Sequence, residues 1–460
     1  MHRSRIAVIG GGIAGLSAAW ILQTRHQVQL FEAEPQLGGH AHTVDVPDPQ
    51  GHTAIDTGFV VYNERNYPLL TRLFDELDVS TQDTDMSFGY SRQPDGVEYA
   101  GSDLNTLFAQ RRNLVRPRFL RMARDILRFN RLGKGLFERR ENPEGTLGAF
   151  LDRHRLGRGF TEDYLLPMAA AIWSCPPEEI REFPAASFLQ FFHNHGLLDL
   201  RDRPQWRTVV GGSREYVGRL ANRLEPRSVV HEPVRAVIPE AGQWRVLTDA
   251  QSNGFDAVVF ACHANTARKL LNGVAPARDR LLSACRFQAN HAVLHTDPAL
   301  MPRSRRVWSS WNYLSGRTTQ AQDRVSVSYW MNRLHRLERR QDYIISLNPW
   351  RDPHPSLVLG EQHWEHPVMD RASESARQRL AATQGEDGLY FAGAWMGYGF
   401  HEDGLRSAVH VGQAMGIEPP WSHPAQAPNA PARPGHVPES TVHGGGPTPV
   451  GAPAAQSRNA

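Results

Sequence analysis

The residue pattern with the clearest chemical meaning is a glycine cluster near the start of the chain. Gly10-Gly11-Gly12-Ile13-Ala14-Gly15 is a GxGxxG pattern that follows the apolar run 6–9 and opens a helix predicted over 14–23. The first glycine permits a tight turn, the second lets the backbone approach a pyrophosphate, and the third lets the helix pack against the strand. The N-terminus of that helix stabilises phosphate charge. The predicted dinucleotide contacts here are Gly10, Gly12, Ile13, Ala14 and Gly15.

Glu32 completes this prediction from the end of a second expected strand, residues 28–32. A carboxylate at this spacing from the glycines can accept hydrogen bonds from the ribose hydroxyls of an adenosine. Strand, helix and strand in this order form a β-α-β unit, which predicts a parallel sheet. The fingerprint alone leaves FAD and NAD as alternatives.

Two further segments resemble a known superfamily that comprises flavin amine oxidases, phytoene desaturases and protoporphyrinogen oxidases. Gln36-Leu37-Gly38-Gly39-His40 is similar to an extension found there just beyond the acidic residue. Downstream, residues 388–393 read as a strand ending in glycine, and Gly404-Leu405-Arg406-Ser407-Ala408 reads as a helix start. The resemblance implies noncovalent FAD and an α/β fold, in which a Rossmann-type FAD-binding domain is interleaved with an α+β substrate domain. The FAD contacts that it implies are Gly38, Gly39, His40, Thr57, Gly58, Val234, Gly393, Ala394, Asp403, Gly404 and Leu405.

Three longer segments resemble, more narrowly, a bacterial group of predicted NAD/FAD-binding proteins. They are residues 37–44, 56–63 and 397–404, and the resemblance covers roughly residues 5 to 417. Members of that group are often encoded beside methyltransferases similar to cyclopropane-fatty-acyl-phospholipid synthases. This association implies a lipid acyl chain as substrate and a lipid methyltransferase as partner.

The chain departs from flavin amine oxidases at positions close to the cofactor. Those enzymes usually have Arg at the position of His40, an acidic residue at that of Ala394, and a lysine near the flavin N5. Lysine occurs here only at Lys134 and Lys269. We therefore expect an FAD-dependent oxidoreductase that removes hydride from a lipid acyl chain, as a desaturase does. The alternatives are a flavin amine oxidase, a flavin-binding accessory protein without redox turnover, and a flavin-assisted isomerase in lipid modification.

The catalytic candidates are His401 and Glu402, because an imidazole beside a carboxylate can transfer protons near neutrality. The alternative is that this segment binds the cofactor and that Asp403 caps a helix. The substrate candidates are Tyr62, Asn63, Trp173 and Tyr398. Tyr62 and Asn63 are equally typical of a turn before a helix over 67–77. Trp173 belongs to an apolar block, 164–174, that could line an acyl tunnel or form an ordinary core.

Composition excludes several classes of protein. The formal net charge of +3 over 460 residues argues against a nucleic-acid partner. The three cysteines lack CxxC spacing, and His40 and His42 lack a nearby third ligand, so we expect neither a disulfide framework nor a metal site. No run of about 20 apolar residues occurs, as a membrane span requires. We expect a cytoplasmic protein, with peripheral contact at the inner membrane surface as a further prediction.

That contact rests on residues 116–140, where arginines alternate with Phe119, Met122, Ile126 and Phe129 at helical spacing. Such a helix can lie on anionic lipid, or its apolar stripe can pack into the protein core. The predicted organisation is an FAD-binding domain in three parts (1–80, 206–275 with a β-meander, and 381–417), a mainly helical lobe (81–205), a substrate-domain sheet (276–380) and a disordered tail rich in Pro, Ala and Gly (418–460).

Overall fold

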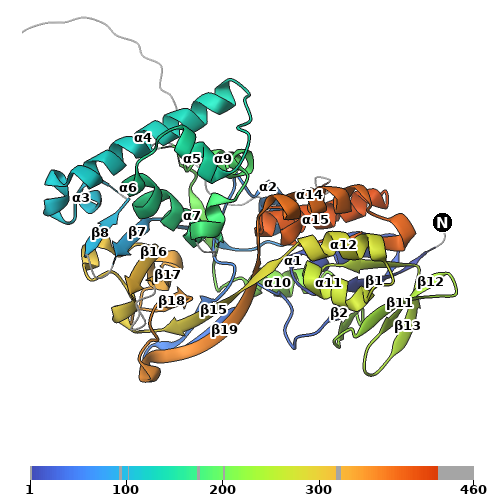
Figure 1. Cartoon of the computed structure of the whole chain (residues 1–460). Coiled ribbons are helices and arrows are strands. Elements are labelled where there is room, and N and C mark those ends of the chain that lie inside the picture. Colours follow the sequence, from blue (N-terminus) through green and yellow to red (C-terminus); the bar gives the residue numbers. More distant parts are fainter. Residues whose placement is uncertain are drawn as a thin grey trace, which may run out of the picture. The chain divides into compact units, whose positions relative to one another are not determined.

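The computed structural model describes residues 3–92, 96–101, 103–173, 177–199, 203–317 and 323–422 (Figure 1). The predicted tail therefore lies outside the described residues, apart from its first five positions. Cys175 also lies outside them.

A five-stranded parallel sheet forms the centre of the domain that the sequence predicts to bind FAD. Its strand order is β10-β2-β1-β14-β20. The strands are β1 (Arg5–Ile9), β2 (Gln27–Glu32), β10 (Val229–His231), β14 (Ala257–Phe260) and β20 (Leu389–Phe391). Three distant parts of the chain thus meet in one sheet, and the carboxyl ends of its strands share one edge, where ligands bind in such folds.

Each face of this sheet is covered by a different set of elements. On one face, Ile6 and Val8 pack with α1 (Ile13–Gln23), α10 (Arg214–Ala221) and α15 (His401–Ala414). On the other, Ala7 and Ile9 pack with α11 (Ala264–Leu271), α12 (Pro276–Ala284), α14 (Arg371–Ala382) and an antiparallel meander. The meander comprises β11 (Ala236–Glu240), β12 (Gln243–Leu247) and β13 (Ser252–Phe255). The layered α/β fold expected from the sequence is confirmed.

A seven-stranded sheet forms the floor of the second region. Its order is β19-β15-β18-β17-β16-β7-β8, with only the β16 and β7 pair parallel. The strands are β7 (Phe88–Arg92), β8 (Val97–Ala100), β15 (Phe287–His295), β16 (Trp311–Arg317), β17 (Asp323–Trp330), β18 (Ile344–Leu347) and β19 (Val358–Pro367). The strands β7 and β8 come from the segment that the sequence assigned to the helical lobe.

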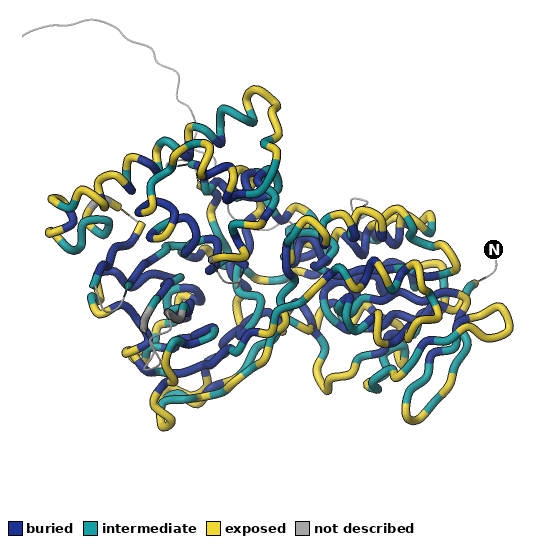
Figure 2. The backbone as a smooth tube through the Cα atoms, in the orientation of Figure 1, coloured by how far each residue is buried: buried dark blue, intermediate teal, exposed yellow. Residues whose placement is uncertain are grey.

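A helical lobe packs on the β7 and β16 side of this sheet (Figure 1). Its helices are α3 (Leu104–Leu107), α4 (Pro117–Glu138), α5 (Leu147–Arg153), α6 (Arg158–Phe160), α7 (Leu166–Trp173), α8 (Pro177–Arg181) and α9 (Ala185–Asn194). The apolar stripe of α4, with Phe119, Met122 and Phe129, is buried in the core of the lobe. For these side chains the core-packing interpretation is therefore correct. Figure 2 shows how buried and exposed residues are distributed along the backbone.

Smaller elements connect the two regions. They are the hairpin β3 (Thr43–Asp48) and β4 (Gly51–Asp56), the small sheet β5 (Tyr62–Asn63), β9 (Trp206–Val209) and β6 (Thr81–Thr84), and the helices α2 (Pro68–Glu76) and α13 (Met331–Leu334). None of the described helices combines the length and the apolarity that crossing a membrane requires.

Candidate cofactor and substrate site

The glycine loop between β1 and α1 has the close packing that its sequence predicts. Gly10 has a φ of 111°, and a Cβ there would lie 2.8 Å from the Ala261 carbonyl oxygen. A Cβ on Gly15 would lie 1.8 Å from the Gly10 carbonyl oxygen. Only glycine at these two positions lets α1 start against the ends of β1 and β14.

Gly12 differs from its neighbours because open space lies beside it. A Cβ on Gly12 would have no heavy atom closer than the Gly38 carbonyl oxygen, at 3.8 Å. Gly12 is also the N-cap of α1, where no side chain caps the helix and the first turn carries no acidic residue. Uncapped N–H groups at a helix start bind anions well. The loop therefore fits a phosphate-bearing group that approaches the backbone at Gly12.

Glu32 lies beside this loop at the end of β2. Its Oε2 accepts a hydrogen bond from the Gly11 N–H at 2.5 Å, and its Oε1 accepts one from the Glu34 N–H at 2.9 Å. These bonds hold the carboxylate at the edge of the cavity that starts at the loop, where it can receive ribose hydroxyls.

A cavity of about 670 Å³ runs from the glycine loop into the space between the seven-stranded sheet and the helical lobe. Most of the cofactor contacts expected from the sequence lie in its wall. They are Gly10, Gly12, Ile13, Ala14, Glu32, Gly38, Gly39, His40, Thr57, Gly58, Val234, Gly393 and Ala394. One continuous cavity thus joins the segments around residues 10, 40, 58 and 394.

Four expected cofactor residues support the wall without lining it. Gly15 and Gly404 permit close packing, because a Cβ on Gly404 would lie 2.9 Å from Cγ2 of Ile13. Leu405 is fully buried in the core beneath α1 and α15. Asp403 accepts hydrogen bonds from the N–H groups of Tyr398 and Phe400 through Oδ2, at 3.0 and 3.1 Å. The capping role considered for Asp403 accounts for this geometry.

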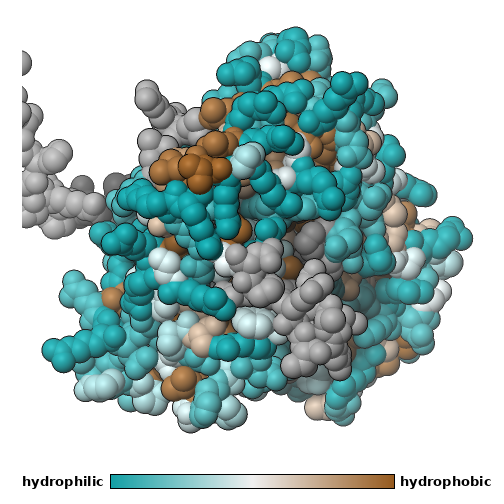
Figure 3. Space-filling view, turned by 60° about the vertical axis from the view of Figure 1, so that its left-hand side comes forward, coloured by the Kyte–Doolittle hydropathy of each residue, from teal (hydrophilic) through white to brown (hydrophobic). Residues whose placement is uncertain are grey.

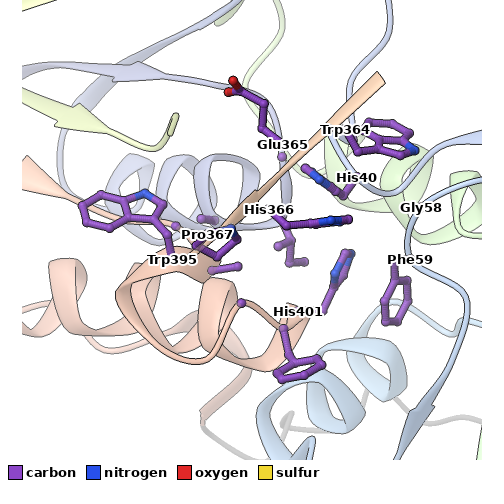
Figure 4. Close-up of a pocket in the computed structure, with 18 of the residues that line it drawn as sticks. His40, Gly58, Phe59, Trp364, Glu365, His366, Pro367, Trp395 and His401 are labelled. Carbon is purple, nitrogen blue, oxygen red and sulfur yellow. The ribbon is translucent and has the colours of Figure 1, made fainter. Parts of the chain in front are cut away.

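Imidazoles gather where the cofactor half of the cavity meets the substrate half: His401 is buried, and His40 and His366 are half-buried (Figure 4). The His40 ring lies 4.7 Å from the Trp364 ring and 5.6 Å from the His366 ring, centroid to centroid. Burial and the neighbouring histidines hold the pKa of His40 well below its ordinary value, and burial lowers that of His366 to about 4. These rings are therefore neutral near pH 7, and each carries one donor and one acceptor nitrogen.

The Nε2 atom of His40 is buried and has no hydrogen-bond partner among the described residues. Such an atom is costly unless a bound group satisfies it. His40 follows Gly38 and Gly39 directly, and a Cβ on Gly39 would lie 3.3 Å from the Gly12 Cα. The orphaned nitrogen and the close-packed glycines both fit a cofactor that passes along this segment.

His401 lies at the start of α15 and reaches the same cavity. Its ring stacks on Phe59 with a centroid distance of 3.7 Å, and its Nε2 lies 2.9 Å from the Tyr216 hydroxyl. Burial lowers the pKa of His401 to about 3. His401 is therefore neutral near pH 7, where its ring can donate or accept hydrogen bonds, and it does not supply a proton as imidazolium.

Glu402 has a different role from the catalytic one that its position beside His401 suggested. Its carboxylate accepts hydrogen bonds from the N–H groups of Leu69 and Leu70, at 3.1 and 3.0 Å, and does not line the cavity. These two groups belong to the first turn of α2, so Glu402 satisfies a helix start. Helix periodicity turns adjacent residues to different sides, which explains the correction.

The substrate candidates divide into two pairs. Tyr62 and Asn63 form the short strand β5, are buried, and do not line the cavity, so their placement corrects the expectation that they face substrate. Trp173 and Tyr398 do line it, together with Met168 and Ile172 of the apolar block. Other members of that block, such as Ala169, are buried core residues, so both interpretations of the block hold in part.

The sequence missed several wall residues. Trp364 and His366 alternate with Glu365 along β19. The side chains of Trp364 and His366 therefore lie on the side of the strand that faces His40, whereas the Glu365 carboxylate points the other way (Figure 4). Phe59, His195 and Trp206 also line the cavity. The alternation Trp364-Glu365-His366 was the available signal, because alternate residues of a strand share a face.

Comparison with known proteins places the chain in a family. The family model described as flavin containing amine oxidoreductase matches residues 13–415. The chain belongs to this family. It is therefore an FAD-dependent oxidoreductase of the flavin amine oxidase and desaturase superfamily, and the predicted superfamily and cofactor are confirmed.

Individual relatives carry different activities in their names. The carotenoid phi-ring synthase of Streptomyces griseus is 28% identical over 291 residues, which are 58% of this chain and 53% of that protein. The match thus spans about half of the relative's length. A candidate protoporphyrinogen oxidase from Exiguobacterium sp. 255-15 has a similar structure, with a TM-score of 0.65, 17% identity, and coverage of 90% and 99% of the two chains. The structure of the CLA-producing fatty acid isomerase from P. acnes is also similar, with a TM-score of 0.62 and 16% identity. That match covers 88% of this chain and 97% of the isomerase. These structural likenesses show the fold.

Proposed function

We propose that this FAD-dependent oxidoreductase acts on a lipid acyl chain, from which it removes hydride as a desaturase does. The observation that carries the proposal is the apolar substrate half of the cavity. That half is lined by Met86, Phe88, Met168, Ile172, Trp173, Phe191, Leu197, Trp311, Tyr329, Met331, Leu334, Ile345 and Leu347. Pockets of this composition gain affinity by removing apolar surface from water.

The charged residues of the cavity wall do not favour an amine. Among the described wall residues the carboxylates are Glu32, Glu34, Glu232 and Glu365. Glu32 ends β2, Glu34 lies two positions past it, and Glu232 directly follows β10, so these three lie at the edge of the parallel sheet that carries the glycine loop. The Glu365 Oε2 is occupied by His263 at 3.3 Å and by Asn265 at 3.1 Å. An alkylammonium in the apolar half would lack a free carboxylate partner, and burying an unpaired charge is costly.

The residues of this chain have definable tasks in such a reaction. Bound FAD supplies the hydride acceptor. The glycine loop and Glu32 hold its dinucleotide part, and the neutral His40 and His401 offer hydrogen bonds without adding positive charge beside an apolar chain. The aromatic and aliphatic wall excludes water from the reacting carbon.

The test is an anaerobic absorbance titration of the purified, FAD-loaded protein. We expect phospholipids with monounsaturated, methylated or cyclopropanated chains to bleach the flavin, and polyamines or aromatic amines to leave it oxidised. Ile172→Trp should slow bleaching at least tenfold, because the larger side chain fills the acyl space, while Val274→Trp, at an exposed position, should not.

Three outcomes would refute the proposal. Bleaching by amines alone would assign an amine oxidase. Conversion of the acyl chain without bleaching or oxygen uptake would assign a flavin-assisted isomerase. A flavin that dithionite reduces but no lipid or amine reduces would assign an accessory role.

A further inference from the structure

Exposed apolar side chains are concentrated on one outer surface of the helical lobe. Of the seven large hydrophobic residues that are exposed among the described residues, four lie between positions 114 and 127. Leu114, Val115, Leu120 and Leu127 are exposed by 49, 79, 44 and 49%. Val115, the most exposed of the seven, ends the 3-10 turn Arg111–Val115 just before α4.

The exposed leucines of α4 are not the apolar stripe that the sequence pattern emphasised. Phe119, Met122 and Phe129 of that stripe are buried in the lobe. Leu120 and Leu127 lie seven positions apart on the outer side, with Arg124 between them and Arg131 four positions after Leu127, all at helical spacing. Helix α4 is thus apolar on two sides, and the packing of the protein uses only one of them.

The same surface is strongly cationic. Residues 104–137 contain nine basic residues and one acidic residue, Asp125. Asp125 is buried, where its Oδ2 accepts the Gly157 N–H at 3.0 Å and its Oδ1 pairs with Arg124. The arginines here that form no ion pair with a described residue include Arg116, Arg121, Arg128 and Arg131. The basic residues of the segment are Arg111, Arg112, Arg116, Arg118, Arg121, Arg124, Arg128, Arg131 and Lys134.

We propose that this docking face, formed by Leu114, Val115, Leu120 and Leu127 with the arginines around them, binds the surface of an anionic phospholipid bilayer. Arginines attract anionic headgroups, and exposed aliphatic side chains near them in the sequence gain free energy by entering the acyl boundary. A nucleic acid would bind through its phosphates to the arginines alone and would leave the leucines exposed to water. Figure 3 shows brown apolar surface set among teal hydrophilic side chains in the upper part of this side of the molecule.

The docking face lies on the same helical lobe that lines part of the cavity. Helices α7 and α9 of the same lobe supply cavity residues, among them Met168 and Phe191. A bilayer bound at α4 would therefore lie against the lobe that walls the apolar half of the cavity. Docking is nevertheless a property of the outer surface, and it holds whether or not the lipid is oxidised.

The test is co-sedimentation of the FAD-loaded full chain with vesicles of phosphatidylcholine alone and with vesicles that contain phosphatidylglycerol. We expect binding to the second kind and little to the first, with affinity falling as salt rises. The double variant Val115→Glu/Leu120→Glu should bind at least tenfold more weakly. Arg128→Gln/Arg131→Gln should lose on the order of 25-fold, about fivefold for each arginine.

Matched variants on other surfaces provide the controls. Val274→Glu and Arg280→Gln change exposed residues, the first two positions before α12 and the second in the middle of α12, and both variants should bind vesicles like the wild type. Flavin absorbance checks that each variant is folded, and the anaerobic titration separately scores lipid oxidation. Absence of binding to phosphatidylglycerol vesicles would overturn the proposal. So would a Val115→Glu/Leu120→Glu variant that binds like the wild type, since only a general attraction to polyanions would then remain.

Discussion

His401 should make the folded protein less stable in weak acid. The imidazole stacks on Phe59, meets the Tyr216 hydroxyl, and has a pKa of about 3, against about 6.5 in an unfolded chain. Between these values the unfolded chain binds a proton that the folded chain excludes. The free energy of unfolding therefore falls as the pH drops below about 6.5, and it continues to fall until the pH reaches the pKa of the folded state, about 3.

The size of the effect follows from the two pKa values. At pH 5 an unfolded histidine is almost fully protonated, whereas His401 in the folded chain stays neutral. The difference amounts to about 2 kcal/mol of stability lost between pH 7.5 and pH 5. His195 and His366, with pKa values lowered by burial to about 4, add losses of the same sign.

A double difference isolates His401 from the other groups. The free energy of unfolding is measured by urea titration with saturating FAD at pH 7.5 and pH 5, for the wild type and for His401→Gln. Glutamine keeps a hydrogen-bonding partner for Tyr216 but does not titrate. We expect the acid-induced loss to be about 2 kcal/mol smaller in the variant. Equal losses in both proteins would refute the account of His401 as a buried neutral imidazole.

Two further predictions concern the glycine loop and α15. Gly12→Ala should leave the unfolding midpoint of the apoprotein within a few degrees of wild type, because a Cβ there meets no atom within 3.8 Å, yet weaken FAD binding at least tenfold in a fluorescence titration. Gly15→Ala, whose Cβ would lie 1.8 Å from the Gly10 oxygen, should destabilise the apoprotein itself, and equal behaviour of the two variants would contradict the distinction. Glu402→Gln should lower stability by about 1–2 kcal/mol, since the start of α2 loses a carboxylate, while flavin reduction changes less than twofold. A hundredfold loss of reduction rate would restore a catalytic role to Glu402.

The local sequence was enough to predict the glycine loop, because the backbone conformation of this short segment depends mainly on its own residues. The turn at Gly10, the close packing at Gly15 and the uncapped helix start at Gly12 depend on residues within a few positions of one another. Backbone sterics at glycine and the polarity of a helix end are local properties, so the dinucleotide loop and its β-α-β unit follow from the sequence. The resemblance of segments far apart in the chain added the identity of the cofactor.

Tertiary structure alone decided which side chains meet. Trp364 and His366 reach His40 because their strand, β19, pairs with β15 at one edge of the seven-stranded sheet, and β19 lies more than 300 residues from the glycine loop. The direction of Glu402 toward α2 likewise depends on the packing of α15. Long-range pairing and the rotation of a helix about its axis are fixed by burial of the whole core, which no local pattern encodes. The sequence therefore predicted the cofactor loop. Which imidazoles and which apolar side chains line the rest of the cavity was decided by the tertiary structure.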